Sequence, residues 1–98
     1  MISIAKLFGP KTDLRELIAN GALVIDVRTP GEFYEGHYPG SENISLDSIM
    51  SSLKDIQRRQ KPVITVCRSG ARSSAAAAML KKAGLQAYHG GVWTNLSR

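Results

Sequence analysis

Two apolar runs of strand length constrain the fold of this chain more than any other feature. The first covers residues 22–27 and the second residues 62–66, and both are almost free of charged side chains. Runs of this kind are typical of strands that are buried on both faces in a parallel sheet. Segments with helical patterns precede, separate and follow them. This alternation predicts an α/β domain with a mostly parallel sheet and helices on both faces.

Start and stop signals of helices flank the first run. Asp13 and Glu16 have the spacing of a capping box, and Gly21 is expected to end the helix that they begin. Residues 29–32 combine an N-cap threonine, a proline at the first helical position and an acid at the third. They predict a second, short helix that ends near Gly36.

Weaker signals predict the remaining elements. Apolar residues recur at helical spacing at Leu46, Ile49, Met50, Leu53 and Ile56. An alanine-rich helix is predicted over 73–83, with Gly84 beyond its end. Further expectations are short strands at 43–44 and 86–88, a turn at 90–91 and an edge strand within 1–7.

Length and composition exclude several classes of protein. The chain has 98 residues, which suits one domain spanning 1–98, and its single cysteine excludes a disulfide scaffold. One cysteine and two distant histidines give no zinc spacing, so we expect no metal and no cofactor. No apolar run is long enough to span a membrane, and the first residues lack a signal-peptide pattern. A cytoplasmic location is therefore expected, unless a leader peptide has been removed.

The net charge of +5 favours anionic partners. Nucleic acid is disfavoured because the basic residues are scattered, without interleaved aromatic residues or a nucleic-acid motif. A small anionic substrate fits this charge better.

Cys67 is the strongest candidate for a reactive residue. It follows the second apolar run directly and precedes a predicted helix, whose free N–H groups stabilise an anion. Gly70 allows the loop to curl, and Arg68 and Arg72 add positive charge. We expect the pKa of Cys67 to be lowered, mostly by backbone N–H groups and then by the arginines, with burial as a smaller opposing effect. The alternative is a small buried hydrophobic residue that ends a strand.

Four segments of the chain together resemble the rhodanese family: 24–28, 36–40, 63–73 with its Cys-Arg-Ser-Gly-Ala-Arg loop, and Gly90-Gly91 with Trp93. The resemblance covers nearly the whole chain. It implies a five-stranded central sheet wrapped by helices. It also implies that Cys67 takes sulfane sulfur from a donor such as thiosulfate, becomes a persulfide, and passes the sulfur to cyanide or to a thiol, including one on a protein.

The length of the cysteine loop separates this chemistry from phosphoryl transfer. Related phosphatases of the same fold resemble the pattern but carry Cys-x5-Arg, usually after a histidine. Here four residues separate Cys67 from Arg72, and Val66 precedes the cysteine. The tighter loop suits a sulfur bonded to cysteine, as the resemblance implies.

The other loop residues receive distinct roles. Arg72 is expected to bind the donor anion through its planar fork, and its alternative role is a loop-closing salt bridge to an acid. Arg68 is expected to point outward and steer anions electrostatically. Ser69, Gly70 and Ala71 are expected to contribute backbone N–H groups.

Residues outside the loop are expected to support it. Asp26 and Arg28 end the first run at the same sheet edge, where they pin loops, by pairing with each other or with loop arginines. His37 is interpreted as a hydrogen-bonded structural residue of the turn at 36–40 rather than a general base. His89 is expected to be exposed or packed near Trp93.

Two classes of function follow. The first is a sulfurtransferase or persulfide carrier, favoured by the intact Cys67 and Arg72. The second is a non-catalytic or regulatory rhodanese-like module that binds a protein partner.

Overall fold

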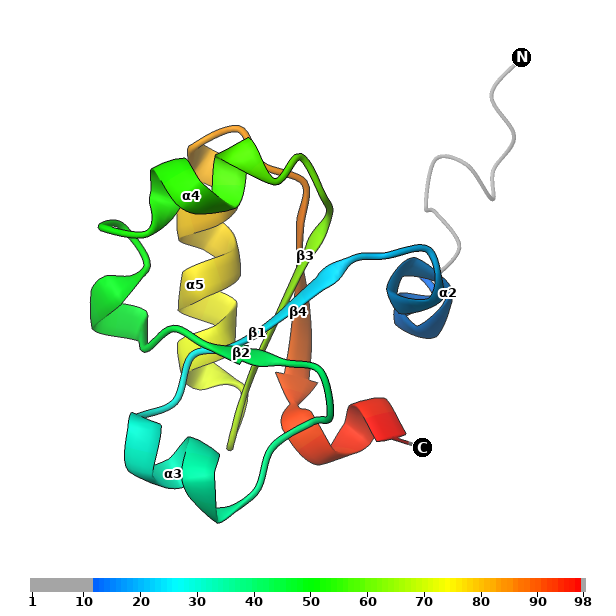
Figure 1. Cartoon of the computed structure of the whole chain (residues 1–98), viewed down its shortest axis with the longest axis vertical. Coiled ribbons are helices and arrows are strands. Elements are labelled where there is room, and N and C mark those ends of the chain that lie inside the picture. The colour runs from blue at the N-terminus through cyan, green and yellow to red at the C-terminus, as the bar shows by residue number, and fades with distance from the viewer. Residues whose placement is uncertain (1–11, 98) are drawn as a thin grey trace.

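A four-stranded parallel sheet runs through the middle of the structure, a computed structural model that describes residues 12–97 (Figure 1). The strand order is β2-β1-β3-β4, and every neighbouring pair is parallel. The strands are β1 (Leu23–Asp26), β2 (Glu42–Asn43), β3 (Val63–Cys67) and β4 (Ala87–Val92). The two apolar runs thus form the central pair of strands, β1 and β3, as their lack of polar residues predicts.

The expected α/β architecture is confirmed, but the number of strands in the described residues differs from the expected number. Residues 12–97 form four strands where the resemblance implied five. Each strand-like run in that range is already part of the sheet, so the range holds no further segment to pair. The edge strand expected within 1–7 lies outside the described residues.

Helices cover both faces of this sheet (Figure 1). One face carries α5 and α4 with the short 3-10 helix η1, and the other carries α2 and the 3-10 helix η2. The helix α3 lies beyond the carboxyl end of β1. The bounds are α2 (Leu14–Ala19), α3 (Pro30–Glu35), η1 (Leu46–Ser48), α4 (Leu53–Arg58), α5 (Ala71–Lys82) and η2 (Trp93–Ser97).

The core consists of two apolar clusters, one on each side of the sheet. Because side chains alternate along a strand, β3 contributes to both. Val63 and Cys67 face α5, whereas Ile64 and Val66 face α2 and η2. All five residues of β3 are buried, and each large apolar side chain contributes about 1.5–3 kcal/mol through burial. This strand therefore holds Cys67 at the end of the most buried element.

The predicted helix boundaries are confirmed at several sites. Thr29 and Glu32 form a reciprocal capping box at the start of α3. Asp13 caps α2 in one direction only, by accepting from two backbone N–H groups of the first turn. Both α2 and α5 end shortly before the expected glycines, Gly21 and Gly84.

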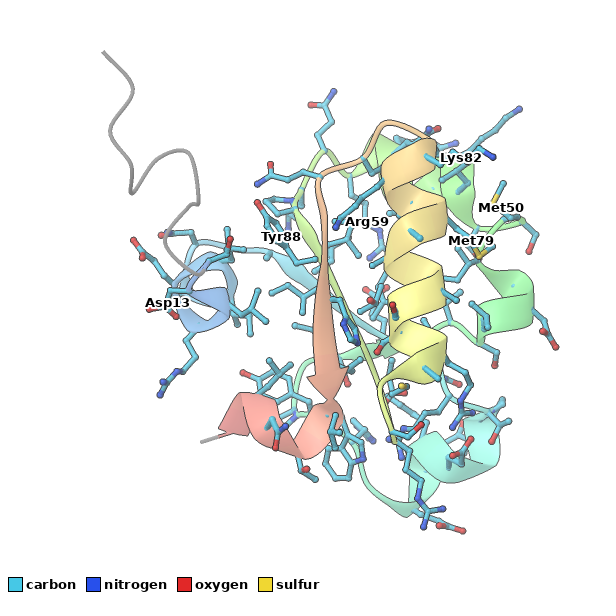
Figure 2. The ribbon with its side chains drawn as sticks, turned by 180° about the vertical axis from the view of Figure 1, so that it is seen from behind. Asp13, Met50, Arg59, Met79, Lys82 and Tyr88 are labelled. Atoms are coloured by element: carbon cyan, nitrogen blue, oxygen red, sulfur yellow. The ribbon has the colours of Figure 1, made fainter. Side chains whose placement is uncertain are left out.

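The segment 46–56 is broken where its apolar spacing predicts a continuous helix. It forms η1 and α4, joined by a turn at 49–52. Met50 lies in this turn with 55% of its surface exposed (Figure 2), so its place in the apolar pattern was coincidental.

The glycine pair near the carboxyl end forms a β-bulge rather than the expected turn. The last strand, expected at 86–88, continues to Val92, and its pairing with β3 shifts by one residue after His89. A Cβ atom on Gly90 would lie 2.8 Å from the side chain of Ile64 and 2.9 Å from the carbonyl oxygen of Thr65. Glycine allows the two strands to approach this closely.

Candidate active site

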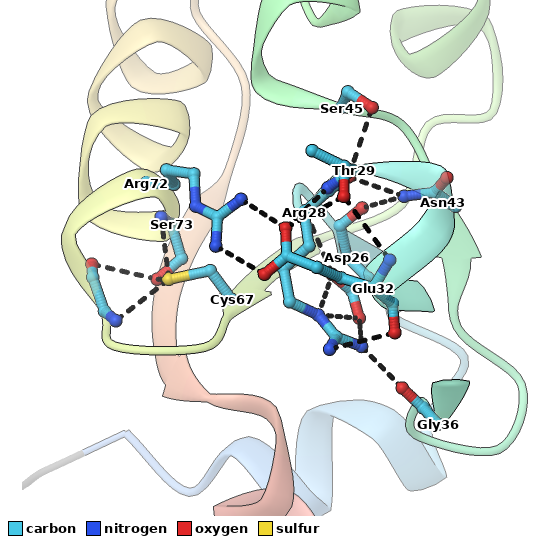
Figure 3. Close-up of polar contacts among 11 residues, drawn as sticks. Asp26, Arg28, Thr29, Glu32, Gly36, Asn43, Ser45, Cys67, Arg72 and Ser73 are labelled. Carbon is cyan, nitrogen blue, oxygen red and sulfur yellow. Dashed lines mark hydrogen bonds and ion pairs between the residues drawn. The ribbon is translucent and has the colours of Figure 1, made fainter. Parts of the chain in front are cut away.

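Backbone N–H groups converge on the sulfur of Cys67, where β3 ends and α5 begins (Figure 3). The Sγ atom accepts a hydrogen bond from the N–H of Gly70 at 2.9 Å and from that of Ser73 at 3.4 Å. Gly70 has a φ of 103°, in the left-handed region that favours glycine. This conformation curls the loop around the sulfur, as the sequence predicts.

The hydroxyl of Ser73 provides a further contact with this sulfur. Its Oγ atom lies 3.3 Å from Sγ and 3.1 Å from the carbonyl oxygen of Gly70. A protonated Cys67 donates to Oγ while the hydroxyl donates to Gly70, and an ionised Cys67 can instead accept from the rotated hydroxyl. Thr65 of β3 holds this part of α5 by donating to the carbonyl oxygen of Ser73 at 2.7 Å.

Sequence analysis missed Ser73, although a signal was present. The buried face of α5 comprises residues 73, 76, 77 and 80, the spacing of one helical stripe. Ser73 is the only polar side chain on that face and lies in the first turn, one of the positions whose N–H groups are free. A serine at such a position predicts a polar contact at the helix start.

Burial and hydrogen bonding act in opposite directions on the pKa of Cys67. Burial is the largest single influence and raises the pKa, because Cys67 has no exposed surface. Hydrogen bonds from the Ser73 side chain and from the N–H groups of Ser73, Gly70 and Ser69 lower it, and the net shift is downward. The expected direction is confirmed, and the hydrogen bonds together outweigh burial, as expected, although burial is the largest single influence. A residue at the end of a five-residue buried strand is shielded from water even when its loop is not.

Arg72 forms a bidentate ion pair with Glu32 of α3 (Figure 3). The two nitrogen–oxygen distances are 2.7 and 2.9 Å, and both side chains are partly exposed. This is the salt bridge that sequence analysis named as the alternative role of Arg72. Glu32 lies 40 positions away in sequence, and its Oε1 also accepts from the N–H and the hydroxyl of Thr29. These bonds, led by those from Arg72, hold the pKa of Glu32 well below its usual range.

Asp26 and Arg28 form a buried ion pair behind the loop (Figure 3). The Arg28 guanidinium donates to both carboxylate oxygens of Asp26, with Nη2 at 2.7 Å, and also to the carbonyl oxygen of Gly36 at 2.7 Å. Its Cζ atom lies 5.0 Å from the ring centre of Trp93, a cation–π distance. The pair thus fixes the turn after α3 and the end of β4 relative to β1.

The remaining loop residues face solvent. Arg68, Ser69 and Ala71 are exposed, and Arg68 lines a groove of about 270 Å³ beside the site. The other residues that line this groove are Arg28, Glu32, Glu35, Gly36 and Trp93.

Neither histidine forms a bond to Cys67. His37 stacks on Phe33, with ring centres 3.7 Å apart, and its Nδ1 lies 2.8 Å from the carbonyl oxygen of Phe33. These contacts fit the structural role that sequence analysis gave it. His89 is exposed and lies next to Gly70, where a Cβ atom would meet its ring at 3.6 Å.

Within the described part of the chain, no three His, Cys, Asp or Glu side chains gather where a metal ion could bind. The helices of residues 12–97 include none long and apolar enough to span a membrane.

Comparison with known proteins identifies the class. The family model of the Rhodanese-like domain matches residues 10–93, and the chain therefore belongs to the rhodanese family. The resemblance found in the sequence is thereby confirmed.

Individual relatives differ in how much of their length is matched. An uncharacterized protein of Bacillus subtilis, YqhL, is 43% identical over 63 residues, which are 64% of this chain and 49% of the relative. The thiosulfate sulfurtransferase GlpE of Pseudomonas syringae is 34% identical over 71 residues, which are 72% of this chain and 66% of that enzyme. The chain thus spans about half to two thirds of these two relatives.

A solved structure shows the same fold over a larger share of both chains. The human single-domain sulfurtransferase TSTD1 is 25% identical, with a TM-score of 0.69, over 92% of this chain and 98% of that protein.

Proposed function

We propose that this protein is a sulfurtransferase that carries sulfane sulfur as a persulfide on Cys67. The observation that carries the proposal is the convergence of the Gly70 and Ser73 N–H groups on the Sγ atom, with a net lowering of its pKa. A nucleophilic cysteine must be ionised near neutral pH, and these donors stabilise the thiolate. Relatives named thiosulfate sulfurtransferase and single-domain sulfurtransferase support this class of activity.

In the first half of the reaction, the Cys67 thiolate attacks the outer sulfur of a donor such as thiosulfate. The sulfur–sulfur bond of thiosulfate breaks, its electron pair leaves with sulfite, and Cys67 becomes a persulfide. In the second half, cyanide or a thiolate attacks the outer sulfur of the persulfide, and the Cys67 thiolate is regenerated. The acceptor leaves as thiocyanate or as a new persulfide, so atoms and charge balance.

The loop residues have different roles in this cycle. Ser69, Gly70 and Ala71 provide the curled backbone, whose N–H groups stabilise negative charge. Arg72 binds the donor anion when its fork is free of Glu32, and Arg68 attracts anions from the rim. Asp26 and Arg28 hold the loops behind the site and take no part in bond making.

Transfer requires side-chain movement around the loop, because Cys67 has no exposed surface. Arg72 is suited to move, since its side chain retains 33% exposure and its guanidinium is held by the ion pair with Glu32. An open and a closed arrangement of this ion pair would then alternate during turnover.

The test is incubation with thiosulfate followed by intact-mass measurement. The wild type is expected to gain one sulfur atom, and adding cyanide should remove it with release of thiocyanate. Cys67→Ser is expected to gain nothing and to transfer no sulfur above background, because an alcohol is not ionised near neutral pH. A folded Cys67→Ser variant with wild-type turnover would overturn the proposal.

A rhodanese-like binding module without catalysis is the second candidate. Two observations favour it: Cys67 is completely buried, and Arg72 is paired with Glu32. Contacts within the chain thus occupy both Cys67 and Arg72. This candidate predicts no mass gain with thiosulfate or with any other sulfane-sulfur donor.

A further inference from the structure

The charged side chains around the candidate site balance one another. The chain carries a net charge of +5, yet three arginines and three carboxylates meet in and directly behind the groove. The arginines are Arg28, Arg68 and Arg72, and the acids are Asp26, Glu32 and Glu35. An anionic donor therefore meets no excess of positive side chains in the groove beside the cysteine loop.

Two of the three arginines are already occupied by carboxylates. The guanidinium of Arg28 is buried against Asp26, and the fork of Arg72 faces both oxygens of Glu32. Glu32 is itself fixed, because its Oε1 accepts from the N–H and the hydroxyl of Thr29 at the start of α3. The carboxylate thus has a defined place beside the loop and stays ionised at neutral pH.

This placement has a different consequence for donors of different charge. The N–H groups of Gly70 and Ser73 face the sulfur and can balance the charge that reacts there. A second negative charge on the donor would need Arg72 as its partner, but Glu32 already occupies that guanidinium. If the ion pair stayed closed, the carboxylate of Glu32 would also repel the second charge.

We infer that Glu32 is a specificity-determining residue that, by holding Arg72, makes the site favour sulfane-sulfur donors with at most one negative charge over doubly charged donors. This inference rests on the proposed sulfurtransferase function. It assigns the donor to the class of singly charged or neutral compounds, such as persulfides of thiols, and makes inorganic thiosulfate a poor match to the site.

A pair of closely similar donors isolates the effect of charge. Thiosulfate is a dianion, whereas methanethiosulfonate carries a methyl group in place of one charged oxygen and is a monoanion. With either donor, the Cys67 thiolate attacks the outer sulfur and the sulfur–sulfur bond breaks. The electron pair leaves with sulfite in the first case and with methanesulfinate in the second, and Cys67 becomes a persulfide in both.

The variant that tests the inference is Glu32→Gln. Glutamine removes the charge but keeps a side-chain oxygen that can cap α3, because Glu and Gln both serve at this position of a capping box. The matched control is Glu35→Gln, which removes the same charge from the same helix and the same groove. Glu35 forms no ion pair within residues 12–97, so the control leaves the Arg72 fork as it is.

The measurement is kcat/KM for both donors at constant ionic strength, with cyanide as the acceptor. For Glu32→Gln we expect kcat/KM to rise about tenfold with thiosulfate, because a charge-assisted hydrogen bond from the freed Arg72 to the second charge of the donor contributes about this much. With methanethiosulfonate, which lacks that second charge, we expect a rise of no more than about threefold. The preference between donors then shifts at least threefold toward thiosulfate. Glu35→Gln should leave that preference within twofold of wild type.

Three outcomes would overturn the inference. One is an unchanged donor preference in Glu32→Gln, and another is an equal shift in Glu35→Gln, which would assign the effect to general charge. The third is a Glu32→Gln protein that is unfolded at the assay temperature in a thermal melt, which would assign Glu32 to stability alone. Failure of the proposed function looks different, because the wild type would then gain no sulfur from either donor.

Discussion

The carboxyl ends of β1 and β3 are neighbours in the sheet, but their polar groups are arranged in opposite ways. At the end of β1, the carboxylate of Asp26 accepts from the side chain and the N–H of Arg28, and Arg28 also donates to Gly36. Both charged groups there are therefore paired within the chain. At the end of β3, N–H groups of Gly70 and Ser73 face a single sulfur atom.

This difference separates a region that stabilises the structure from a region that can take part in a reaction. A buried ion pair with both partners present holds the structure, and removing one partner leaves an uncompensated charge. Donors gathered around a sulfur contribute less to stability, but they change its acidity and stabilise the charge that develops on it. We therefore expect changes at the end of β1 to affect folding and changes at the end of β3 to affect the reaction.

Asp26→Ala is expected to cause the largest loss of stability. Arg28 would remain buried without its carboxylate, which costs about 3–5 kcal/mol of the free energy of unfolding, a large part of the total for a domain of this size. Urea denaturation followed by circular dichroism measures the change. The control is Asp55→Ala, which breaks the exposed pair with Arg59 and should cost less than about 1 kcal/mol (Arg59 is labelled in Figure 2). Equal losses in the two variants would remove the contrast between the strand ends.

Arg72→Ala is expected to lower kcat/KM for thiosulfate by about tenfold or more, through the loss of a charge-assisted hydrogen bond and the exposure of an unpaired Glu32. Steady-state assays with cyanide measure the effect. Arg72→Lys keeps the charge without the planar fork and should recover only part of it. If kcat/KM with thiosulfate were unchanged in Arg72→Ala, the residue would serve structure alone.

Ser73→Ala is expected to raise the pKa of Cys67 and to slow sulfur loading about fivefold at neutral pH, because the thiolate loses one hydrogen bond. The pH dependence of iodoacetamide alkylation reports the acidity directly, since the chain has one cysteine. Ser74→Ala changes the exposed neighbour on the same helix and serves as the control. An identical alkylation profile in Ser73→Ala and wild type would assign the serine to packing.

Arg68→Ala is expected to have the smallest effect. Its side chain is exposed at the rim, so it can act only at a distance, and kcat/KM for thiosulfate should fall no more than about twofold at physiological salt. The difference from wild type should grow in dilute buffer and vanish in concentrated salt. A loss that persists at high salt would show that Arg68 contacts the donor directly.

The parts of the site that sequence analysis found are those encoded by neighbouring residues. The buried runs, the capping box of Thr29 and Glu32, and the glycine-containing cysteine loop each depend on a few consecutive positions. Glu32 could be assigned to its helix start, but its pairing with Arg72 depends on where α3 lies relative to α5. Sequence spacing alone cannot give that distance.

Other misses have a related cause. Met50 fits a helical apolar pattern, yet the chain turns there and leaves it exposed. The burial of Cys67 was underestimated because accessibility depends on all surrounding segments rather than on the residue's place at a strand end. The bulge at Gly90 went unrecognised because two adjacent glycines also suit a turn.

That bulge restricts which insertions and deletions the carboxyl-terminal part can accept. The extra residue lets β4 continue until Val92 lies opposite Cys67, and Trp93 then follows against Arg28 and Gly36. Deleting one of the two glycines would restore a regular ladder and move every later residue by one position. Because successive side chains point to opposite faces, Trp93 would then turn away from Arg28. The length of this segment is therefore fixed more strictly than the identity of most of its residues.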